Sequence, residues 1–482
     1  MAYDSKKISL FGGVDRVAVL LYIALVMVGL VAVFSASWIE GSENFFAFSH
    51  NYIKQAVWFG ISLVVGVVIL LLDASIWHKI AYYLYVVAIL ALVVTLLIGS
   101  EVNGARAWIK FGPVQLQTME FAKIAIAIAT ARLMSEYGFS IHSAKDLMKV
   151  ALLLFVPLAI TVLQNDTGSG LVLCSFIFML YREGLNKWLC IPVLCIAALF
   201  ILSFIYSSTA LLVALIVIFT LTEWLNNRRG RDCVVYVASL FGVSLSLYLA
   251  INAIPTVAVS YYTILLVTTI LSLVVVCVYA YRQRLRNLYV LVALFAASVA
   301  ILPTSNAVFS ALRPHQQKRI EVFLGIATDN AYDYNVRQSK IAIGSGGWFG
   351  KGYLQGSQIR YGLVPEKHTD FIFCTIGEEF GFVGAFAVLV LIAAFIMRLM
   401  RMGDRQRETF GRVYCYAVAS VLLFHTLINV GMTIGLVPVM GIPLPLISYG
   451  GSSLLAFTVM IFIAFSLDAQ TNREIPSSYR YL

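Results

Sequence analysis

Long apolar runs separated by short polar segments occupy most of the chain. A helix needs about twenty apolar residues to cross the hydrocarbon core of a bilayer, and most runs approach or exceed that length. The runs are continuously apolar, which excludes the alternating pattern of membrane β-strands, so each run predicts a helix. We count about fourteen runs, at residues 17–37, 53–72, 80–98, 121–134, 148–163, 170–181, 188–206, 210–224, 234–254, 257–281, 288–302, 371–397, 413–435 and 446–467.

The composition supports a membrane protein. Of the 482 residues, 61% are hydrophobic and 12% are charged, and the mean hydropathy is +0.89. An ordinary globular protein is about one-quarter charged, so the sequence predicts an all-α, polytopic integral membrane protein. The first run is longer than the core of a secretory signal, which indicates a retained anchor, although Ser35-Ala36-Ser37 resembles a cleavage site. The seven cysteines stand singly, so neither a disulfide framework nor a zinc site is expected.

The net charge of +10 would suggest a nucleic-acid partner in a soluble protein. Here the cations lie mostly in short loops between apolar runs, which indicates orientation in a membrane and no nucleic acid. Both termini are then cytoplasmic, and the segments 38–51, 100–118, 164–169 and 306–369 lie on the outer side. The loops assigned to the cytoplasm carry Lys6, Lys7, Arg182, Lys187, Arg228, Arg229, Arg231, Arg282, Arg284, Arg286, Arg398, Arg401, Arg405 and Arg407.

The stretch PEKHTDFIFCTIGEEFG places charged and polar residues at the entrance of an apolar run. Asp370 stands at or just before the start of the predicted helix, where the helix dipole favours an acid and a carboxylate can cap free N–H groups. The alternative is a chemical role for Asp370 in the company of Glu366, Lys367 and His368.

Two further acids, Glu378 and Glu379, follow inside the same run. Eight residues of helix rise about 12 Å and turn about 80° beyond full turns, so Glu378 lies below Asp370 on roughly the same side and Glu379 points the other way. Ionisable side chains at this depth are costly. They normally face a cavity, pair with a cation or take part in chemistry.

A second polar cluster is NGARAWIKFGPVQLQTMEFAK. Asn103-Gly104 is typical of a turn. Trp108 suits the membrane interface, and its aromatic face could also stack on a sugar. Glu120 and Lys123 are three residues apart and share one helix face, which favours a buried, mutually neutralising pair over catalysis.

Cations gather in the outer segment 306–369, whose length and composition indicate an ordered functional loop. An excess of cations on the outer side runs against the usual bias, so it suggests an anionic ligand such as a phosphate or diphosphate. Pairing with acids of the same loop, Glu321, Asp329 and Asp333, is the alternative. Neighbouring glycines permit close backbone approach and could form an anion nest. The cations are Arg313, Lys318, Arg319, Lys340 and Lys351, and the glycines are Gly344, Gly346, Gly347, Gly350 and Gly352.

A fourth cluster, GLVPVMGIPLPLISYGGSSLL, precedes the final apolar run. Pro438, Pro443 and Pro445 interrupt the helical pattern there. Ser448 and Tyr449 bring polar groups to the start of the last span. The segment is therefore either a re-entrant structural turn or one wall of a site.

These stretches together resemble the SEDS family of cell-wall polymerases. PEKHTDFIFCTIGEEFG and PLPLISYGGSSLL are highly specific to that family. NGARAWI, LQNDTGSGLVL and HQQKRI occur in the family's order, so the resemblance covers both ends of the chain. IAIGSGGWFGKGYLQGSQ is more similar to the rod-elongation branch of the family than to its division branch.

The resemblance implies a core of about ten helices, interrupted here by about four inserted ones. An even number of inserted spans keeps the following loop, and Asp370, on the outer side. The expected parts are 1–206, the N-terminal part of the core; 207–303, the inserted helices; 304–369, the large extracytoplasmic loop; 370–468, the C-terminal core helices; and 469–482, a cytoplasmic tail.

The resemblance also implies an activity: polymerisation of lipid II into peptidoglycan at the outer face of the bacterial cytoplasmic membrane. The expected partner is a class B penicillin-binding protein, which cross-links the product. A sugar hydroxyl of one lipid-linked disaccharide attacks the anomeric carbon of another, and polyprenyl diphosphate leaves with inversion. Asp370, in the family's His-Thr-Asp-Phe motif, is the expected base. Arg106, Arg319 and Lys351 are candidate diphosphate ligands, and a divalent cation, Mg²⁺ or Mn²⁺, could bridge Asp370 to phosphate.

Two local departures from the family occur, but the acids remain. The family's Gln-Pro-Ser-Glu reads Gln117-Thr118-Met119-Glu120, and its Gln-Pro-Asp-Leu-Gly reads Gln164-Asn165-Asp166-Thr167-Gly168. Substrate contacts are expected from Trp108, Arg106, Arg319, Lys351, His368, Glu366 and Ser448, and structural or cavity roles from Glu120, Lys123, Asp166 and Glu378.

Other classes of function remain open at this point. A lipid flippase or transporter would use the intramembrane polar residues as a pathway. A division-type polymerase of the same family is a second alternative, and a non-catalytic scaffold for cell-wall synthases is a third.

Overall fold

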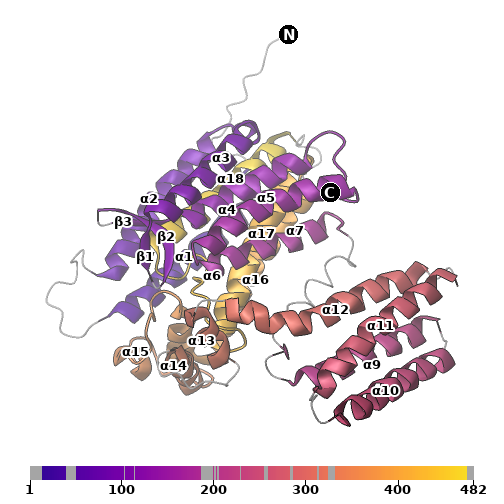
Figure 1. Cartoon of the computed structure of the whole chain (residues 1–482). Coiled ribbons are helices and arrows are strands. Elements are labelled where there is room, and N and C mark those ends of the chain that lie inside the picture. Colours follow the sequence, from indigo (N-terminus) through magenta and orange to yellow (C-terminus); the bar gives the residue numbers. More distant parts are fainter. Residues whose placement is uncertain are drawn as a thin grey trace. The chain divides into compact units, whose positions relative to one another are not determined.

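The chain forms helices at nearly every described position where an apolar run predicts one (Figure 1). The computed structural model describes residues 13–474 except 39–49, 103, 113, 186–198, 200–201, 204–205, 228–229, 255–258, 283–285, 312–313 and 324–331. The chain divides into two compact units, Met1–Leu185 with Thr328–Leu482, and Asn186–Ala327.

The first unit is a bundle of membrane helices. Its helices are α1 (Arg16–Ser37), α2 (Asn51–Leu71), α3 (Ser75–Ile98), α4 (Thr118–Met134), α5 (Ala144–Leu163), α6 (Thr167–Leu171), the 3-10 helix η1 (Val172–Ser175), α7 (Phe176–Arg182), α14 (Tyr332–Ser345), α15 (Ser357–Arg360), α16 (Ile372–Arg405), α17 (Thr409–Thr433) and α18 (Gly451–Glu474). Helices from the two ends of the chain pack side by side, α1 on α16 and α2 on α18 (Figure 1).

The helices α17 and α18 form the centre of this bundle, and α4 packs against both of them. Protein buries 72% of the span of α17 and 83% of that of α18, against 17% for α3. Central helices can therefore carry polar side chains that find partners inside the protein, whereas the outer helices present apolar side chains outward.

A small antiparallel sheet lies between α3 and α4, where the sequence predicted only a turn. Its strands are β1 (Ser100–Val102), β2 (Ala105–Phe111) and β3 (Val114–Gln117), in the order β1-β2-β3. Trp108 of β2 lies opposite Gln117 of β3. Gly104 has φ 83°, which fits the predicted turn, while Asn103 lies outside the described residues.

The second unit contains a helical bundle with a core of its own. Its described helices are α9 (Ser208–Asn227), α10 (Gly230–Asn252), α11 (Tyr261–Arg282), α12 (Arg286–Ala311) and α13 (Pro314–Phe323). The helices α9 to α12 pack around a cluster that includes Leu212, Leu265 and Phe295. The unit begins before the predicted insertion 207–303 and ends after it. Most of the predicted span 188–206 lies outside the described residues.

Ten helices of the described part are long and apolar enough to cross a membrane. Two shorter apolar helices, Thr167–Arg182 and Phe295–Thr304, accompany them. The prediction of an all-α, polytopic membrane protein is confirmed, because the three short strands are the single small sheet in the described part.

The long helix α16 is broken near its start. Gly381 adopts φ 65° and ψ −163° within it, so the backbone hydrogen-bond ladder is interrupted. In a membrane such freed groups need partners from the protein, and here the segment after α14 supplies them. Phe382 N and Val383 N donate to the carbonyls of Gly347 (2.8 Å) and Trp348 (3.1 Å), and Lys351 N and Gly352 N donate to those of Glu378 and Glu379 (3.0 Å each).

The glycines of that segment are explained by its close approach to α16. A Cβ on Gly346 would lie 2.0 Å from the Gly377 carbonyl oxygen, and a Cβ on Gly350 would lie 2.0 Å from that of Glu379. No larger residue fits at either position without moving backbone. The predicted anion nest of Gly344, Gly346, Gly347, Gly350 and Gly352 is wrong. Gly344 lies inside α14, and the N–H groups of the other four glycines all donate to carbonyls of the protein.

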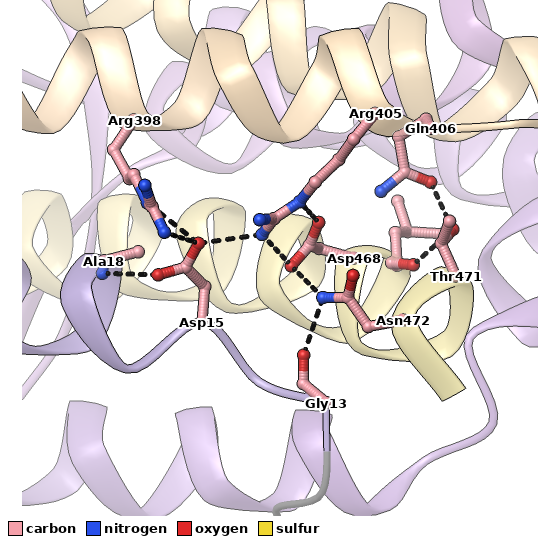
Figure 2. A network of polar contacts seen from close by, with 10 residues as sticks. Gly13, Asp15, Ala18, Arg398, Arg405, Gln406, Asp468, Thr471 and Asn472 are labelled. Carbon is pink, nitrogen blue, oxygen red and sulfur yellow. Dashed lines mark hydrogen bonds and ion pairs between the residues drawn. The ribbon is translucent and has the colours of Figure 1, made fainter. Parts of the chain in front are cut away.

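A network of ion pairs joins three helices of the first unit (Figure 2). Asp15 caps α1, and its Oδ2 lies 2.8 Å from a nitrogen of Arg398 and 2.8 Å from one of Arg405. Arg405 also binds Asp468 of α18 through two N–O contacts of 2.5 Å. The network ties α1, α16 and α18 together near the C-terminal end of α16, at the other end of that helix from PEKHTDF.

Candidate active site

Asp370 lies just before α16 and is partly buried. The helix begins at Ile372 and its N-cap position is Phe371, so Asp370 does not occupy the cap itself. Its carboxylate lies against the segment that precedes α18, because a Cβ built on Gly441 would come within 3.5 Å of Asp370 Oδ2. Gly441 also has φ 69°, which favours glycine. The helix dipole favours an anion at this place.

The backbone that carries Asp370 is held from two sides. Three consecutive carbonyls, those of residues 368, 369 and 370, accept hydrogen bonds from distant parts of the chain. The donors lie on α17 and in the segment between α17 and α18, so that segment does form a wall beside Asp370. The bonds run from Tyr449 N to His368 O (2.8 Å), from the Ser448 hydroxyl to Thr369 O (2.7 Å) and from the Asn429 amide to Asp370 O (2.8 Å).

Ser448 was expected to contact substrate, but the structure gives it a different task. Its side chain is buried, and its hydroxyl also accepts a hydrogen bond from Leu444 N at 2.8 Å. The hydroxyl therefore donates to Thr369 and accepts from Leu444, both inside the protein. Ser448 therefore holds the backbone of Thr369, the residue before Asp370.

His368 and Lys367 border a cavity of about 270 Å³. The end of α1 and the start of α2, including Trp38 and His50, form its other described walls. Burial lowers the pKa of the His368 imidazole; the charge of Glu366 opposes this effect and the charge of Lys367 adds to it. His368 is therefore neutral near pH 7. Its ring centre lies 5.7 Å from that of Tyr449.

Glu378 is fully buried, and the segment after α14 supplies partners for both of its carboxylate oxygens. Lys351 Nζ lies 2.6 Å from Glu378 Oε1. The backbone N–H groups of Gln358 and Ile359 donate to the same carboxylate at 2.9 and 3.0 Å. Because Glu378 neutralises Lys351, the geometry favours a structural ion pair over the predicted contact with diphosphate.

Glu379, the next residue, leaves α16 in another direction. It accepts a hydrogen bond from the hydroxyl of Ser35 on α1. The helical spacing predicted that the two neighbouring acids diverge, and their partners on separate elements agree with it.

The pair Glu120–Lys123 is buried, as predicted. The ammonium lies 2.8 Å from Glu120 Oε1, and both side chains are almost inaccessible. The same ammonium lies 2.9 Å from His425 Nε2 on α17 and 5.1 Å from the ring centre of Phe457 on α18. His425, expected to be structural or interfacial, belongs to the core where α4, α17 and α18 meet.

Asp166 caps the short helix α6. Its Oδ1 accepts from Ser169 N at 3.1 Å, and its Oδ2 accepts from the amide of Gln117 at 2.8 Å. The preceding Asn165 has φ 61°. Proline cannot adopt that angle because its ring holds φ near −65°. The departure from the family's Gln-Pro-Asp motif therefore comes with a different local backbone that keeps the acid at the cap.

Trp108 and Arg106 lie on β2 of the small sheet. Trp108 is partly buried, whereas Arg106 is exposed and makes a loose pair with Glu101 at 3.7 Å. Exposed pairs of this kind contribute little to stability, so Arg106 can exchange Glu101 for an anionic ligand. The N–H of Arg106 donates to Gln164 O at 2.9 Å, which ties the sheet to the turn before Asp166.

Some predicted contacts stay predictions. Arg319 lies on α13 in the second unit, Arg313 lies outside the described residues, and Glu366 is exposed with Oε2 accepting from Thr369 at 2.8 Å. Among the described residues, no group of three or more His, Cys, Asp or Glu side chains is arranged to hold a metal ion.

Sequence reasoning missed the helix residues that hold the segments around Asp370. Asn429 on α17 donates to the Asp370 and Ile442 carbonyls, and Gln55 on α2 accepts from Gly450 N at 3.2 Å. Both are almost fully buried polar side chains inside apolar runs. A polar side chain inside an apolar run is costly in a membrane unless it has a partner, so its presence there could have identified both residues as structurally important.

The fold and this site define a class: a polytopic helical membrane protein that holds a partly accessible acid at one end of its bundle. The chain belongs to the FtsW/RodA/SpoVE family, described as cell cycle proteins, the family called SEDS above. The family's model matches residues 15–231 and 212–473.

The sequences of relatives align with most of the chain. It is 30% identical over 460 residues to the peptidoglycan glycosyltransferase RodA of Treponema pallidum, covering 95% of this chain and 98% of that one. It is 30% identical over 417 residues to the peptidoglycan glycosyltransferase MrdB of Escherichia coli K12, with 86% and 84% covered. A probable peptidoglycan glycosyltransferase FtsW of Saccharophagus degradans is 26% identical over 457 residues, with 93% and 91% covered.

Solved structures share the fold. The rod shape determining protein RodA of Thermus thermophilus matches with a TM-score of 0.54 and 23% identity, covering 94% of this chain and 96% of that one. A chain from a peptidoglycan synthase complex, described as coordinating polymerization and crosslinking, matches with a TM-score of 0.58 and 22% identity, covering 95% and 98%.

Proposed function

We propose that the chain is a peptidoglycan glycosyltransferase that polymerises lipid II into glycan strands. Family membership and the activity named for its relatives support the reaction class. The observation that carries the mechanism is Asp370, which is partly buried just before α16, while Asn429 of α17 holds its carbonyl and Ser448 holds that of Thr369.

In the proposed step, a hydroxyl of one lipid-linked disaccharide attacks the anomeric carbon of another. The new carbon–oxygen bond forms as the bond from that carbon to the diphosphate breaks, and polyprenyl diphosphate leaves with the electron pair. Asp370 takes the hydroxyl proton as general base. One displacement inverts the anomeric centre. The held backbone places the carboxylate before substrate arrives, which lowers the entropic cost of the step.

The leaving diphosphate needs positive charge. Arg106, exposed on β2, and Arg319, on α13, are the proposed ligands, because a guanidinium binds phosphate oxygens through two N–H groups at once. Trp108 offers an aromatic face to a sugar. His368 and Glu366 contact the substrate beside Asp370, and the neutral state of His368 leaves the negative charge of Asp370 unopposed by that ring.

The cellular role follows from the same resemblance. Relatives named RodA and MrdB are 30% identical to the chain and the FtsW relative is 26% identical, which favours elongation over division. The proposed partner is a class B penicillin-binding protein. The proposed location is the bacterial cytoplasmic membrane, with both termini cytoplasmic and Asp370 outside.

A flippase would need a connected polar pathway through the bundle. Glu120 pairs with Lys123 in the core. Asp166 caps a helix, and Glu378 is saturated by the segment after α14. Local partners satisfy each of these groups, so the observed contacts favour structural roles over a pathway.

Asp370→Asn tests the proposal. Asparagine keeps the shape of the side chain but cannot accept the proton, so we expect the purified variant to form glycan from lipid II at least about 10²-fold more slowly than wild type. The measurement is electrophoresis of labelled polymer made in detergent. Polymer from the purified wild-type chain also separates an enzyme from a flippase, because detergent solution has no compartments.

Asp73→Asn is the matched control, since it makes the same change in an exposed turn between α2 and α3. Its activity should equal that of wild type. Equal polymer yields from the two variants would remove Asp370 from the mechanism, and a wild-type chain that makes no polymer would contradict the enzyme itself.

A further inference from the structure

A buried series of hydrogen bonds links the Glu120–Lys123 pair of α4 to the segment beside Asp370. Its middle member is His425, whose side chain is almost inaccessible. Its Nε2 lies 2.9 Å from Lys123 Nζ, and its Nδ1 lies 3.2 Å from the carbonyl oxygen of Pro443. The imidazole therefore bridges the core of the bundle and the segment between α17 and α18.

The two partners decide which ring nitrogen carries the proton. An ammonium is only a donor, so Nε2 of His425 accepts from Lys123. A carbonyl is only an acceptor, so Nδ1–H donates to Pro443. Only the neutral imidazole with its proton on Nδ1 satisfies both. Lys123, itself held 2.8 Å from Glu120 Oε1, thus sets the tautomer that makes the bond to Pro443.

The Pro443 carbonyl lies next in sequence to a carbonyl that shares its hydrogen-bond donor with Asp370. The preceding carbonyl, of Ile442, accepts from the Asn429 amide at 2.7 Å, and that amide also donates to Asp370 O at 2.8 Å. His425 and Asn429 are four residues apart on α17, so they lie on one face, one turn from each other. One stripe of α17 therefore holds two adjacent carbonyls of the segment together with Asp370.

We propose that His425 is a positioning residue for the polymerase reaction. Its Nδ1–H holds the Pro443 segment, and through that segment it keeps the Asp370 carboxylate in its reactive place. This inference rests on the proposed function. Misplacing a reacting group by about 1 Å costs about 10²-fold in rate. Loss of one bond in the series is expected to lower kcat about tenfold and to leave KM within about twofold, because His425 is buried away from substrate.

Three variants test the proposal with lipid II. His425→Phe removes both polar contacts while keeping a ring, and we expect it to show the tenfold loss in kcat. His425→Gln retains a donor and an acceptor and should restore most of the rate. Thr426→Val is the matched control: Thr426 is also buried on α17, and its hydroxyl bonds to Leu422 O of its own helix at 2.8 Å. Equal kcat in all three, with activity still dependent on Asp370, would overturn the inference and leave the proposed function standing.

A second measurement does not depend on activity. Hydrogen–deuterium exchange should be faster in His425→Phe than in wild type or Thr426→Val within residues 366–371 and 441–449. Unchanged exchange in both segments would overturn the inference whatever the substrate is. If His425→Phe instead loses its fold and exchanges throughout α17, His425→Gln decides: it must show wild-type exchange and most of the wild-type kcat, and failure of either result would also overturn the inference.

Discussion

At the scale of single residues, the charged groups near the start of α16 have two different tasks. Asp370 is partly buried, whereas Glu378, eight positions later, is completely buried and bound to Lys351. A charge inside a membrane protein is costly unless a partner and hydrogen bonds satisfy it. The buried pair therefore stabilises the segment after α14.

Removing the cation of that pair should destabilise the protein. Lys351→Met leaves the Glu378 carboxylate buried without its cation, so we expect a loss of about 3–5 kcal/mol. Combining it with Glu378→Gln should recover most of the loss. Thermal unfolding in detergent measures both. Lys149→Met, which breaks an exposed pair of 2.8 Å with Asp146, is the control and should cost at most about 1 kcal/mol. Equal losses from the two lysines would contradict the structural role of Lys351.

His368 should make stability depend on pH. Burial lowers its folded-state pKa below the unfolded value, although the charge of Glu366 opposes this effect. The unfolded chain then binds the proton more readily, so stability is unaffected well above about pH 6.5, falls as the pH drops from there toward the folded-state pKa, and changes no further below it. We expect the melting temperature to fall as the pH drops below about 6.5, and His368→Gln to reduce that fall. The exposed His142 provides the control: His142→Gln should leave it unchanged. The same pH dependence in both variants would show that protonation of His368 does not lower the stability.

At the scale of elements, α16 is completed by another part of the chain. A membrane helix can be discontinuous only where the protein supplies partners for its freed backbone groups. The backbone of residues 347–352 supplies them on both sides of Gly381. The segment between α14 and α15 is therefore part of the helix architecture that carries Asp370.

Alanine substitutions in this segment should separate close approach from backbone strain. Gly350→Ala puts a Cβ 2.0 Å from Glu379 O, so it should destabilise most and reduce polymerisation. Gly347 has φ 55° but open space, so Gly347→Ala should cost about 1–2 kcal/mol. Gly344 lies in α14 with open space, and Gly344→Ala should stabilise by about 0.4–1 kcal/mol. Melting temperatures rank the three, and a Gly350→Ala variant as stable as Gly347→Ala would argue against the fit to α16.

At the scale of the whole molecule, α9 to α12 belong to a second compact unit that has its own core. The helices α9 to α12 pack on one another around Leu212, Leu265 and Phe295. We propose that this self-contained bundle is an insertion into the family fold. If it adds an even number of spans, the later loop and Asp370 keep their side of the membrane.

Labelling of single cysteines tests this sidedness. Tyr361 and Tyr137 are highly exposed, at 75% and 107%, and lie in segments predicted to face opposite sides. We expect Tyr361→Cys to react with a membrane-impermeant maleimide in intact spheroplasts and Tyr137→Cys to react only after permeabilisation. The unsubstituted chain controls for its native cysteines. The reverse pattern would place Asp370 in the cytosol, away from the cell wall.

Local sequence patterns were enough to predict the helices and one buried ion pair. Helix positions followed from the apolar runs because bilayer thickness and backbone satisfaction leave few alternatives. The Glu120–Lys123 pair followed from its spacing. The sheet of residues 100–117 did not, because such short strands depend on their context more than on intrinsic preference. Lys351 was predicted to bind phosphate but forms an ion pair, because its partner Glu378 lies on α16, far from it in the sequence.

The amino-acid sequence by itself determined the membrane class, the order of the helices, the family and the place of Asp370 at the start of a helix. These features reside in contiguous residues, whose periodicity and motifs can be read directly. Only the tertiary structure decided that glycines fit a broken α16, that Glu378 takes up the charge of Lys351, and that His425 and Asn429 reach the Asp370 segment. Those contacts join residues far apart along the chain, and only packing brings them within hydrogen-bond distance.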